Sequence, residues 1–317
     1  WVNAGGSLIA MALFLGSLEY VLEEGARNDW FEDHLIVLFT LVAIAGGAAF
    51  FWRTLTRPNP LVDLSAFQDR NFAFGSLFSF SVGIGLYGLT YVYPVYLSRV
   101  RGFDALMIGE TMFVSGIAMF CTAPIAGILS RKLDLRWMLA LGLIGFAAGT
   151  YMASGITRDW DFWELLMPQV LRGCSIMIAM VPVNNIALGT LPPAKMKGAS
   201  GLYNLTRNLG GAVGLAIINT MINTRTDLHL ARLHERISLS HIPAQEMLDA
   251  LTARFGNLGT DANLAAMAKL NALVHREALV MAFGDLFLAL TVLFVTLACA
   301  TLLLNKPSPA ASGGGGH

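Results

Sequence analysis

Charged residues are scarce in this chain of 317 amino acids. Asp, Glu, Lys and Arg make up 13% of it, whereas 55% of the residues are apolar and the mean hydropathy is +0.61. Soluble domains carry about 25% charged residues. The formal net charge is zero, and the sequence has no basic block of the kind that binds nucleic acid. We therefore predict an all-α polytopic membrane protein, with the lipid bilayer as its partner and no nucleic acid.

Cysteines and catalytic motifs are also few. The three cysteines, Cys121, Cys174 and Cys299, fall inside apolar runs, which is typical of packing residues rather than of disulfides or metal clusters. The sequence lacks G-x-S-x-G, H-E-x-x-H, C-x-x-C and Walker-type motifs. His229 and His234 are five residues apart, a poor spacing for one helical face, so we expect no metal site. These features argue against an enzyme, and we expect no cofactor.

Eight apolar runs reach the length of about 20 residues that a membrane-spanning helix needs. The expected spans are residues 2–22, 34–52, 71–97, 105–129, 136–154, 163–190, 199–223 and 278–304. They predict a linker helix pair over 1–52, a linker over 53–70, a six-helix bundle over 71–304 and a flexible tail over 305–317. The chain begins Trp1-Val2-Asn3-Ala4 without Met, and we expect it to be the carboxyl portion of a longer protein.

Lysine and arginine are unevenly distributed between the connectors, which predicts orientation. One set of connectors carries Arg53, Arg57, Arg70, Arg131, Lys132, Arg136, Lys195, Lys197 and Lys306, and the other carries Arg27, Arg99, Arg101 and Arg158. The first set is expected to be cytoplasmic, so both chain ends lie in the cytoplasm. The long connector 224–277 then lies outside, as short amphipathic helices that form either a packed cap or a contact for a periplasmic partner.

Two ionisable residues lie inside expected spans at similar depth. Arg172 and Asp285 each follow the outer start of a span by about two turns, roughly 10–12 Å at 1.5 Å per residue. We predict that they pair, either as a proton-responsive couple or as a fixed ion pair that holds helices together. Glu110, near the outer end of its span, either joins this layer or lies at the membrane interface.

Four further polar residues lie within two or three turns of the connector 191–200. They are Asn184, Asn185, Asn204 and Arg207. We predict an inner polar layer that opens and closes the cytoplasmic side, or a set of ordinary inter-helix hydrogen bonds.

The segments GASGLYN (Gly198–Asn204) and RNLGGAVG (Arg207–Gly214) resemble those of EmrB/QacA-type drug:proton antiporters, the 14-helix branch of the major facilitator superfamily. The segment GILSRKLDLR (127–136) resembles the cytoplasmic G-x-L-a-D-r-x-G-R-k loop of the superfamily, which implies a conformational latch. Its candidate residues are Gly127, Arg131, Lys132, Asp134 and Arg136, with Arg131 in place of the first Asp and Asp134 in place of Gly.

The resemblance implies an inner-membrane protein that comprises the linker pair and the C-terminal six-helix bundle, without the first six helices. It implies a proton-coupled multidrug exporter that works by alternating access on small amphipathic substrates and protons. A periplasmic adaptor and an outer-membrane channel would be its partners. Two alternatives stay open, namely an exporter of an endogenous solute such as a fatty acid or siderophore, and a non-transporting membrane scaffold or sensor.

Overall fold

The computed structural model describes residues 2–26, 28, 30–56, 64–236, 242–256 and 261–304. These residues form helices joined by short turns, and no strand occurs in the described ranges. The predicted tail 305–317 and part of the predicted linker, residues 57–63, lie outside the described residues. The long helices are α1 (Val2–Glu24), α2 (His34–Thr56), α3 (Arg70–Tyr96), α4 (Ala105–Lys132), α5 (Leu135–Ser154), α6 (Phe162–Leu188), α7 (Pro193–Arg236), α8 (Ile242–Arg254) and α9 (Ala262–Ala300).

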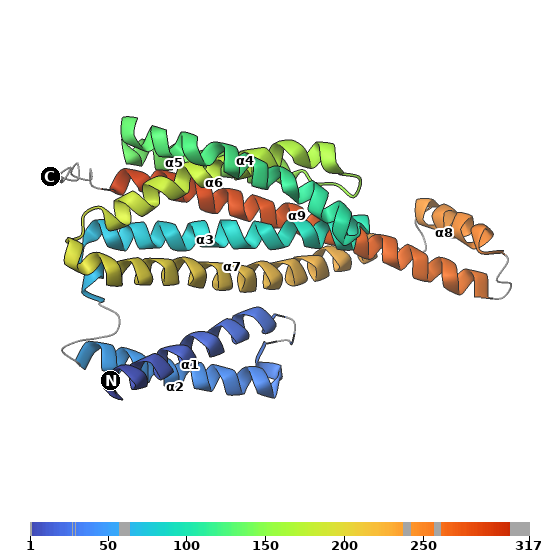
Figure 1. Cartoon of the computed structure of the whole chain (residues 1–317). Helices are drawn as coiled ribbons and strands as arrows, with labels where there is room; N and C mark the ends of the chain where they lie inside the picture. Colours follow the sequence, from blue (N-terminus) through green and yellow to red (C-terminus); the bar gives the residue numbers. More distant parts are fainter. Residues whose placement is uncertain are drawn as a thin grey trace.

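Seven of the described helices, α1–α6 and α9, are long and apolar enough to cross a membrane. The predicted all-α polytopic fold is therefore confirmed. The remaining expected span, residues 199–223, lies within α7, which runs alongside α3 and α9 (Figure 1). Its polar residues Asn204, Arg207 and Asn208 keep α7 from being uniformly apolar.

The connector 224–277 is largely helical, but its first helix is continuous with the span before it. α7 continues unbroken to Arg236, and α9 begins at Ala262 and runs into the final span. The reason is that no glycine or proline interrupts residues 224–236. The two extensions and α8, which packs on α9, project from one end of the bundle, called the α8 end below (Figure 1).

Glycines bring α3 and α7 into backbone contact. A Cβ atom on Gly83 would collide with the carbonyl oxygen of Arg207, and one on Gly210 with the carbonyl oxygen of Phe80. In a membrane the hydrophobic effect does not drive helices together, so close van der Waals contact of this kind stabilises their packing. The contact fixes α7, and with it Arg207, against α3.

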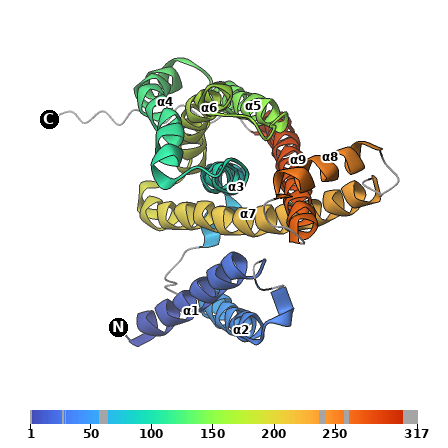
Figure 2. The ribbon, with the colours of Figure 1, turned by 90° about the vertical axis from the view of Figure 1, so that its right-hand side faces the viewer.

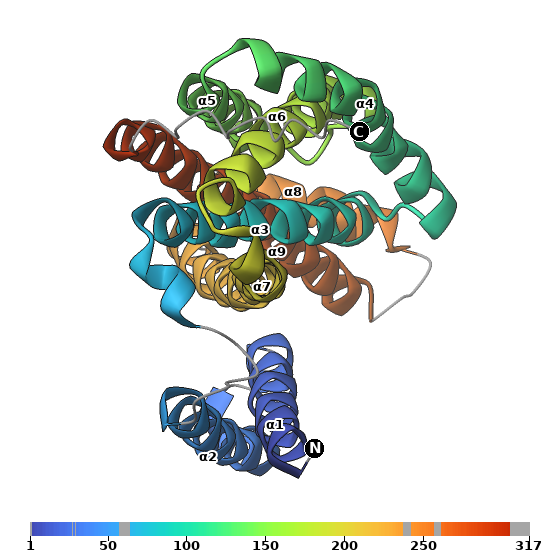
Figure 3. The same cartoon turned by 60° about the vertical axis from the view of Figure 1, so that its left-hand side comes forward.

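The helix pair α1–α2 lies beside the bundle, on the side of α7 (Figures 2 and 3). Gly46 of α2 packs on the backbone of Phe14 in α1, where a Cβ atom would lie 2.9 Å from the amide nitrogen. The Asn223 Nδ2 of α7 donates a hydrogen bond to the carbonyl oxygen of Ala26, 3.2 Å away, just beyond the end of α1. α1 begins and α9 ends at the same end of the structure, opposite the α8 end (Figure 1).

Candidate functional site

Arg172 lies inside the bundle with its charge only partly satisfied. The side chain comes from α6 and is 7% exposed. Its Nη2 donates to Ser115 Oγ of α4 at 3.0 Å, and the guanidinium lies over the ring of Tyr93 in α3, 5.6 Å from the centroid. Nη1 is buried and donates to none of the described residues. A buried cation with a vacant N–H can bind an incoming acceptor group.

Small residues position Ser115 beneath Arg172. A Cβ atom on Gly173 would lie 2.6 Å from the Ser115 carbonyl oxygen and 2.8 Å from the Ala118 Cβ, so α4 and α6 touch at this point. One turn earlier, the buried Gln169 donates from Nε2 to the Thr111 carbonyl oxygen at 3.0 Å, and its Oε1 accepts from none of the described residues. The α4–α6 interface thus carries two vacant polar atoms, one donor and one acceptor.

Aromatic packing fixes the ring on which Arg172 lies. Tyr93 is fully buried, and its ring centroid lies 5.4 Å from that of Phe287 in α9. Phe146 of α5 and Phe294 of α9 stack two turns further along, with centroids 4.3 Å apart. α3, α5, α6 and α9 therefore share one core, and the guanidinium lies at its edge.

The predicted pairing of Asp285 with Arg172 is wrong for this structure. Asp285 Oδ2 instead lies 2.9 Å from His229 Nε2 and 3.7 Å from Arg225 Nη1, both on α7. Residue counting placed Asp285 and Arg172 at similar depth but could not give the direction in which each side chain points. Asp285 faces the extension of α7, whereas Arg172 faces α4.

Asp285 and His229 line a cavity of about 370 Å³ between α9, α7 and the end of α5. His229 is 6% exposed, and its Nδ1 bonds to none of the described residues. Glu277 also lines the cavity. No group of three or more His, Cys, Asp or Glu that could hold a metal ion occurs among the described residues. The cluster of Asp285, His229 and Arg225 is a carboxylate–imidazole pair next to an arginine.

Arg207 connects α7 with two other helices. Its Nη2 donates to Asn184 Oδ1 of α6 at 3.1 Å, and its Nε donates to Ser79 Oγ of α3 at 3.3 Å. The guanidinium lies over the ring of Tyr203, 5.0 Å from the centroid. Arg207 and Arg172 form no ion pair with any residue that the structure describes.

The structure brings together two of the four residues of the predicted inner layer, Arg207 and Asn184. Asn185 and Asn204 are exposed on their helices. The sequence argument did not include Asn208 in the layer, although its Oδ1 accepts a hydrogen bond from the Tyr87 hydroxyl of α3 at 3.1 Å. The α3–α7 contact is thus more polar than we expected.

The predicted latch segment forms the turn between α4 and α5. Asp134 is the N-cap of α5, where its carboxylate accepts from the Arg136 backbone N–H at 3.1 Å. Arg131 and Lys132 are exposed in the last turn of α4, and the space around Gly127 is open. In this structure Leu133 caps the end of α4, Asp134 caps the start of α5, and Arg131 and Lys132 face outward.

Glu110 lies on the exposed side of α4, apart from Asp285. The same helix exposes large apolar side chains along its length, including Phe113 and Phe120, the latter 83% exposed. α4 packs mainly on α6, so much of its surface is free to contact lipid or another protein.

These features define a membrane transporter fold. The Major Facilitator Superfamily model matches residues 1–215, and the chain belongs to this family. A solved bacterial homologue of the human lysosomal transporter Spinster, inward-facing and unoccupied, is similar in fold at 18% identity, with a TM-score of 0.50 over 98% of this chain and 71% of that one.

Within the superfamily, several of the similar proteins are EmrB proteins, as the sequence motifs predicted. The chain is 38% identical to the colistin resistance protein EmrB of Acinetobacter baumannii, over 95% of this chain and 59% of that protein. It is 30% identical to the multidrug export protein EmrB of Escherichia coli, over 98% of this chain and 60% of that protein. It is 28% identical to the fatty acid resistance protein FarB of Neisseria gonorrhoeae, again over 98% of this chain and 60% of that protein. The chain thus spans about 60% of the length of these relatives.

Proposed function

We propose that this chain is the C-terminal part of a proton-coupled inner-membrane exporter of amphipathic compounds that works by alternating access. The observation that carries the proposal is Arg172, a buried guanidinium with a vacant Nη1. A charge inside a membrane bundle costs several kcal/mol, roughly 2.5–3.5 on insertion scales, and such residues mark substrate or ion pathways. The multidrug export and resistance proteins among the relatives support the substrate class.

Alternating access requires a second bundle that closes on the first around a midplane site. The exposed apolar face of α4, with Phe113 and Phe120, offers a surface for such a bundle. A carboxylate from that bundle would bind the vacant Nη1 of Arg172 when ionised and leave it when protonated. Proton binding would then shift the balance between two arrangements of the halves.

The cluster of Asp285 and His229 supplies a second proton-binding group. It joins α9 to α7 at the α8 end, next to a cavity of about 370 Å³. A proton on Asp285 would remove the charge that attracts both His229 and Arg225. The contacts of Asp285 with His229 and Arg225 would therefore weaken when the carboxylate carries a proton and strengthen when that proton leaves.

The projecting ends of α7 and α9, together with α8, support a periplasmic role for the α8 end. Both chain ends would then be cytoplasmic, since α1 begins and α9 ends at the opposite end (Figure 1). α8 and the extensions would contact a periplasmic adaptor, which in turn would reach an outer-membrane channel.

The test is efflux driven by a pH gradient in inverted membrane vesicles. The protein would be this chain joined to the six helices that the proposal requires before it. We expect Arg172→Gln to abolish ethidium efflux, whereas Arg99→Gln, an exposed arginine on the turn after α3, should leave it unchanged. Wild-type efflux by the Arg172→Gln variant would refute the proposal. Movement of a labelled fatty acid but not of ethidium would favour the endogenous-solute exporter.

A further inference from the structure

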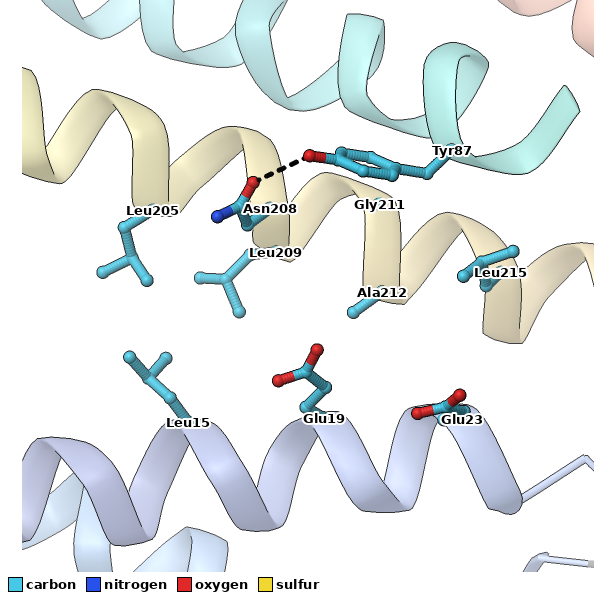
Figure 4. Close-up of a pocket in the computed structure, with 10 residues that line it drawn as sticks. All are labelled: Leu15, Glu19, Glu23, Tyr87, Leu205, Asn208, Leu209, Gly211, Ala212 and Leu215. Atoms are coloured by element: carbon cyan, nitrogen blue, oxygen red, sulfur yellow. Dashed lines mark hydrogen bonds between the residues drawn. The ribbon is translucent and has the colours of Figure 1, made fainter. Parts of the chain in front are cut away.

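A groove of about 440 Å³ runs between α1 and α7, outside the six-helix bundle. Leu15, Glu19 and Glu23 of α1 are four residues apart, and all three point across the groove toward α7 (Figure 4). The opposite wall carries Leu205 and Leu209 of α7 (Figure 4). An acidic stripe thus faces an apolar wall.

The floor of the groove is held by packing. Tyr87 of α3 donates its hydroxyl to Asn208 Oδ1 at 3.1 Å, and its ring packs directly against Gly211, where a Cβ atom would collide with it. At the α8 end, the bond from Asn223 to the Ala26 carbonyl ties the end of α1 to α7. The Tyr87 contacts fix the floor against α7, and the bond from Asn223 to Ala26 holds the two walls together at one end.

The charge in the groove is of one sign. Among its lining residues, Glu19 and Glu23 are the ionisable carboxylates, and no Lys, Arg or His lines it. Neither carboxylate forms an ion pair with the residues that the structure describes. Glu19 and Glu23 both lie in the last turns of the apolar span Gly6–Glu24, and two like charges one helical turn apart destabilise a helix. A cation between the two carboxylates would remove this penalty.

We propose that this groove binds an amphipathic organic cation, with its charge between Glu19 and Glu23 and its apolar body against Leu205 and Leu209. The volume lies within the roughly 300–1,000 Å³ of small-molecule pockets. Because α1 is a membrane-spanning helix beside the bundle, a ligand reaches the groove from the lipid. The groove's part in export rests on the proposed function, whereas binding to it does not.

The experiment measures binding alone, using this chain in detergent micelles and isothermal titration. Tetraphenylphosphonium and tetraphenylborate, which share one shape but carry opposite charge, are titrated separately against a micelle blank. We expect the double variant Glu19→Gln/Glu23→Gln to bind tetraphenylphosphonium at least about tenfold more weakly, the loss of roughly 1.4 kcal/mol of ion pairing, and tetraphenylborate no more weakly. The matched control is Glu32→Gln, an exposed acid between α1 and α2 that does not line the groove.

A second variant keeps the test decisive should the double variant fail to fold. Ala212 faces the groove from α7, so Ala212→Phe fills the space and leaves both carboxylates in place (Figure 4). It should lower tetraphenylphosphonium affinity at least about tenfold. Equal affinity of the wild type for the two ions, or unchanged cation binding in either variant, would overturn the proposal. Intact binding without efflux would count against the proposed export function instead, so the two failures are distinguishable.

Discussion

Replacing Arg172 by methionine should abolish transport while leaving the fold as stable as before. Methionine fills a similar apolar volume along the α4–α6 interface but carries neither the charge nor the N–H groups. In the wild type the guanidinium contacts Ser115 and Tyr93, and its Nη1 is buried without a partner among the described residues. The substitution removes favourable and unfavourable contributions together.

The two contributions are similar in size. A hydrogen bond from a charged group contributes about 1.5–3 kcal/mol, and a cation–π contact about 0.5–2 kcal/mol. Against these stands the penalty for burying an incompletely paired charge, which is several kcal/mol after relaxation. We therefore expect the free energy of unfolding of Arg172→Met to lie within about 2 kcal/mol of the wild type.

Two measurements test this expectation. Thermal unfolding in detergent, followed by tryptophan fluorescence, should show a midpoint within about 8 °C of the wild type, since about 1 kcal/mol shifts the midpoint by roughly 2–4 °C in proteins of 150–250 residues. Efflux in vesicles should fall by about 100-fold or more, the equivalent of one lost charged hydrogen bond in the pathway. Ser115→Ala, which leaves the charge of Arg172 in place, should reduce efflux far less. If the midpoint fell by 10 °C or more while efflux was retained, Arg172 would contribute to stability and not to transport.

Three other substitutions probe separate parts of the structure. Gly210→Ala should destabilise the protein by about 1–3 kcal/mol, because the added methyl meets the Phe80 carbonyl, whereas Gly201→Ala on an open face of the same helix should be neutral or slightly stabilising in thermal unfolding. Asp285→Asn should uncouple efflux from the pH gradient while leaving substrate binding intact, and vesicle efflux with unchanged pH dependence would remove the proton role. Asp134→Ala should lower the free energy of unfolding by about 1 kcal/mol, because α5 loses its N-cap. A marked loss of efflux in a variant that still folds would support the latch role.

The sequence was sufficient to predict the all-α membrane fold and to single out two polar residues inside its spans. Length and apolarity of the runs predicted the helices, because a bilayer admits few alternatives to spanning helices. The same reasoning picked out Arg172 and Arg207 as polar residues inside apolar spans, and the structure places Arg172 buried between α4 and α6. It also paired Arg207 with the right region of α6, where Asn184 accepts its hydrogen bond.

The sequence argument failed where partners depend on the direction of a side chain. Counting residues gave the depth of Asp285 but not the helix it faces, so its contact with His229 was missed. The spacing of four between Arg225 and His229, which puts both on one face of a helix, could have indicated that site. Glu19 and Glu23 share the same spacing, but the groove depends on α7 lying opposite them, which no local pattern predicts.

The most direct test of the account is dye efflux driven by a pH gradient in inverted vesicles, comparing this chain alone with the chain joined to the six helices that the proposed function requires before it. Both proteins must first be shown to insert and fold. We predict efflux from the joined protein and none from the chain alone, because a single bundle has no second half to close around the substrate. Efflux from the chain alone, or from neither protein, would contradict the account.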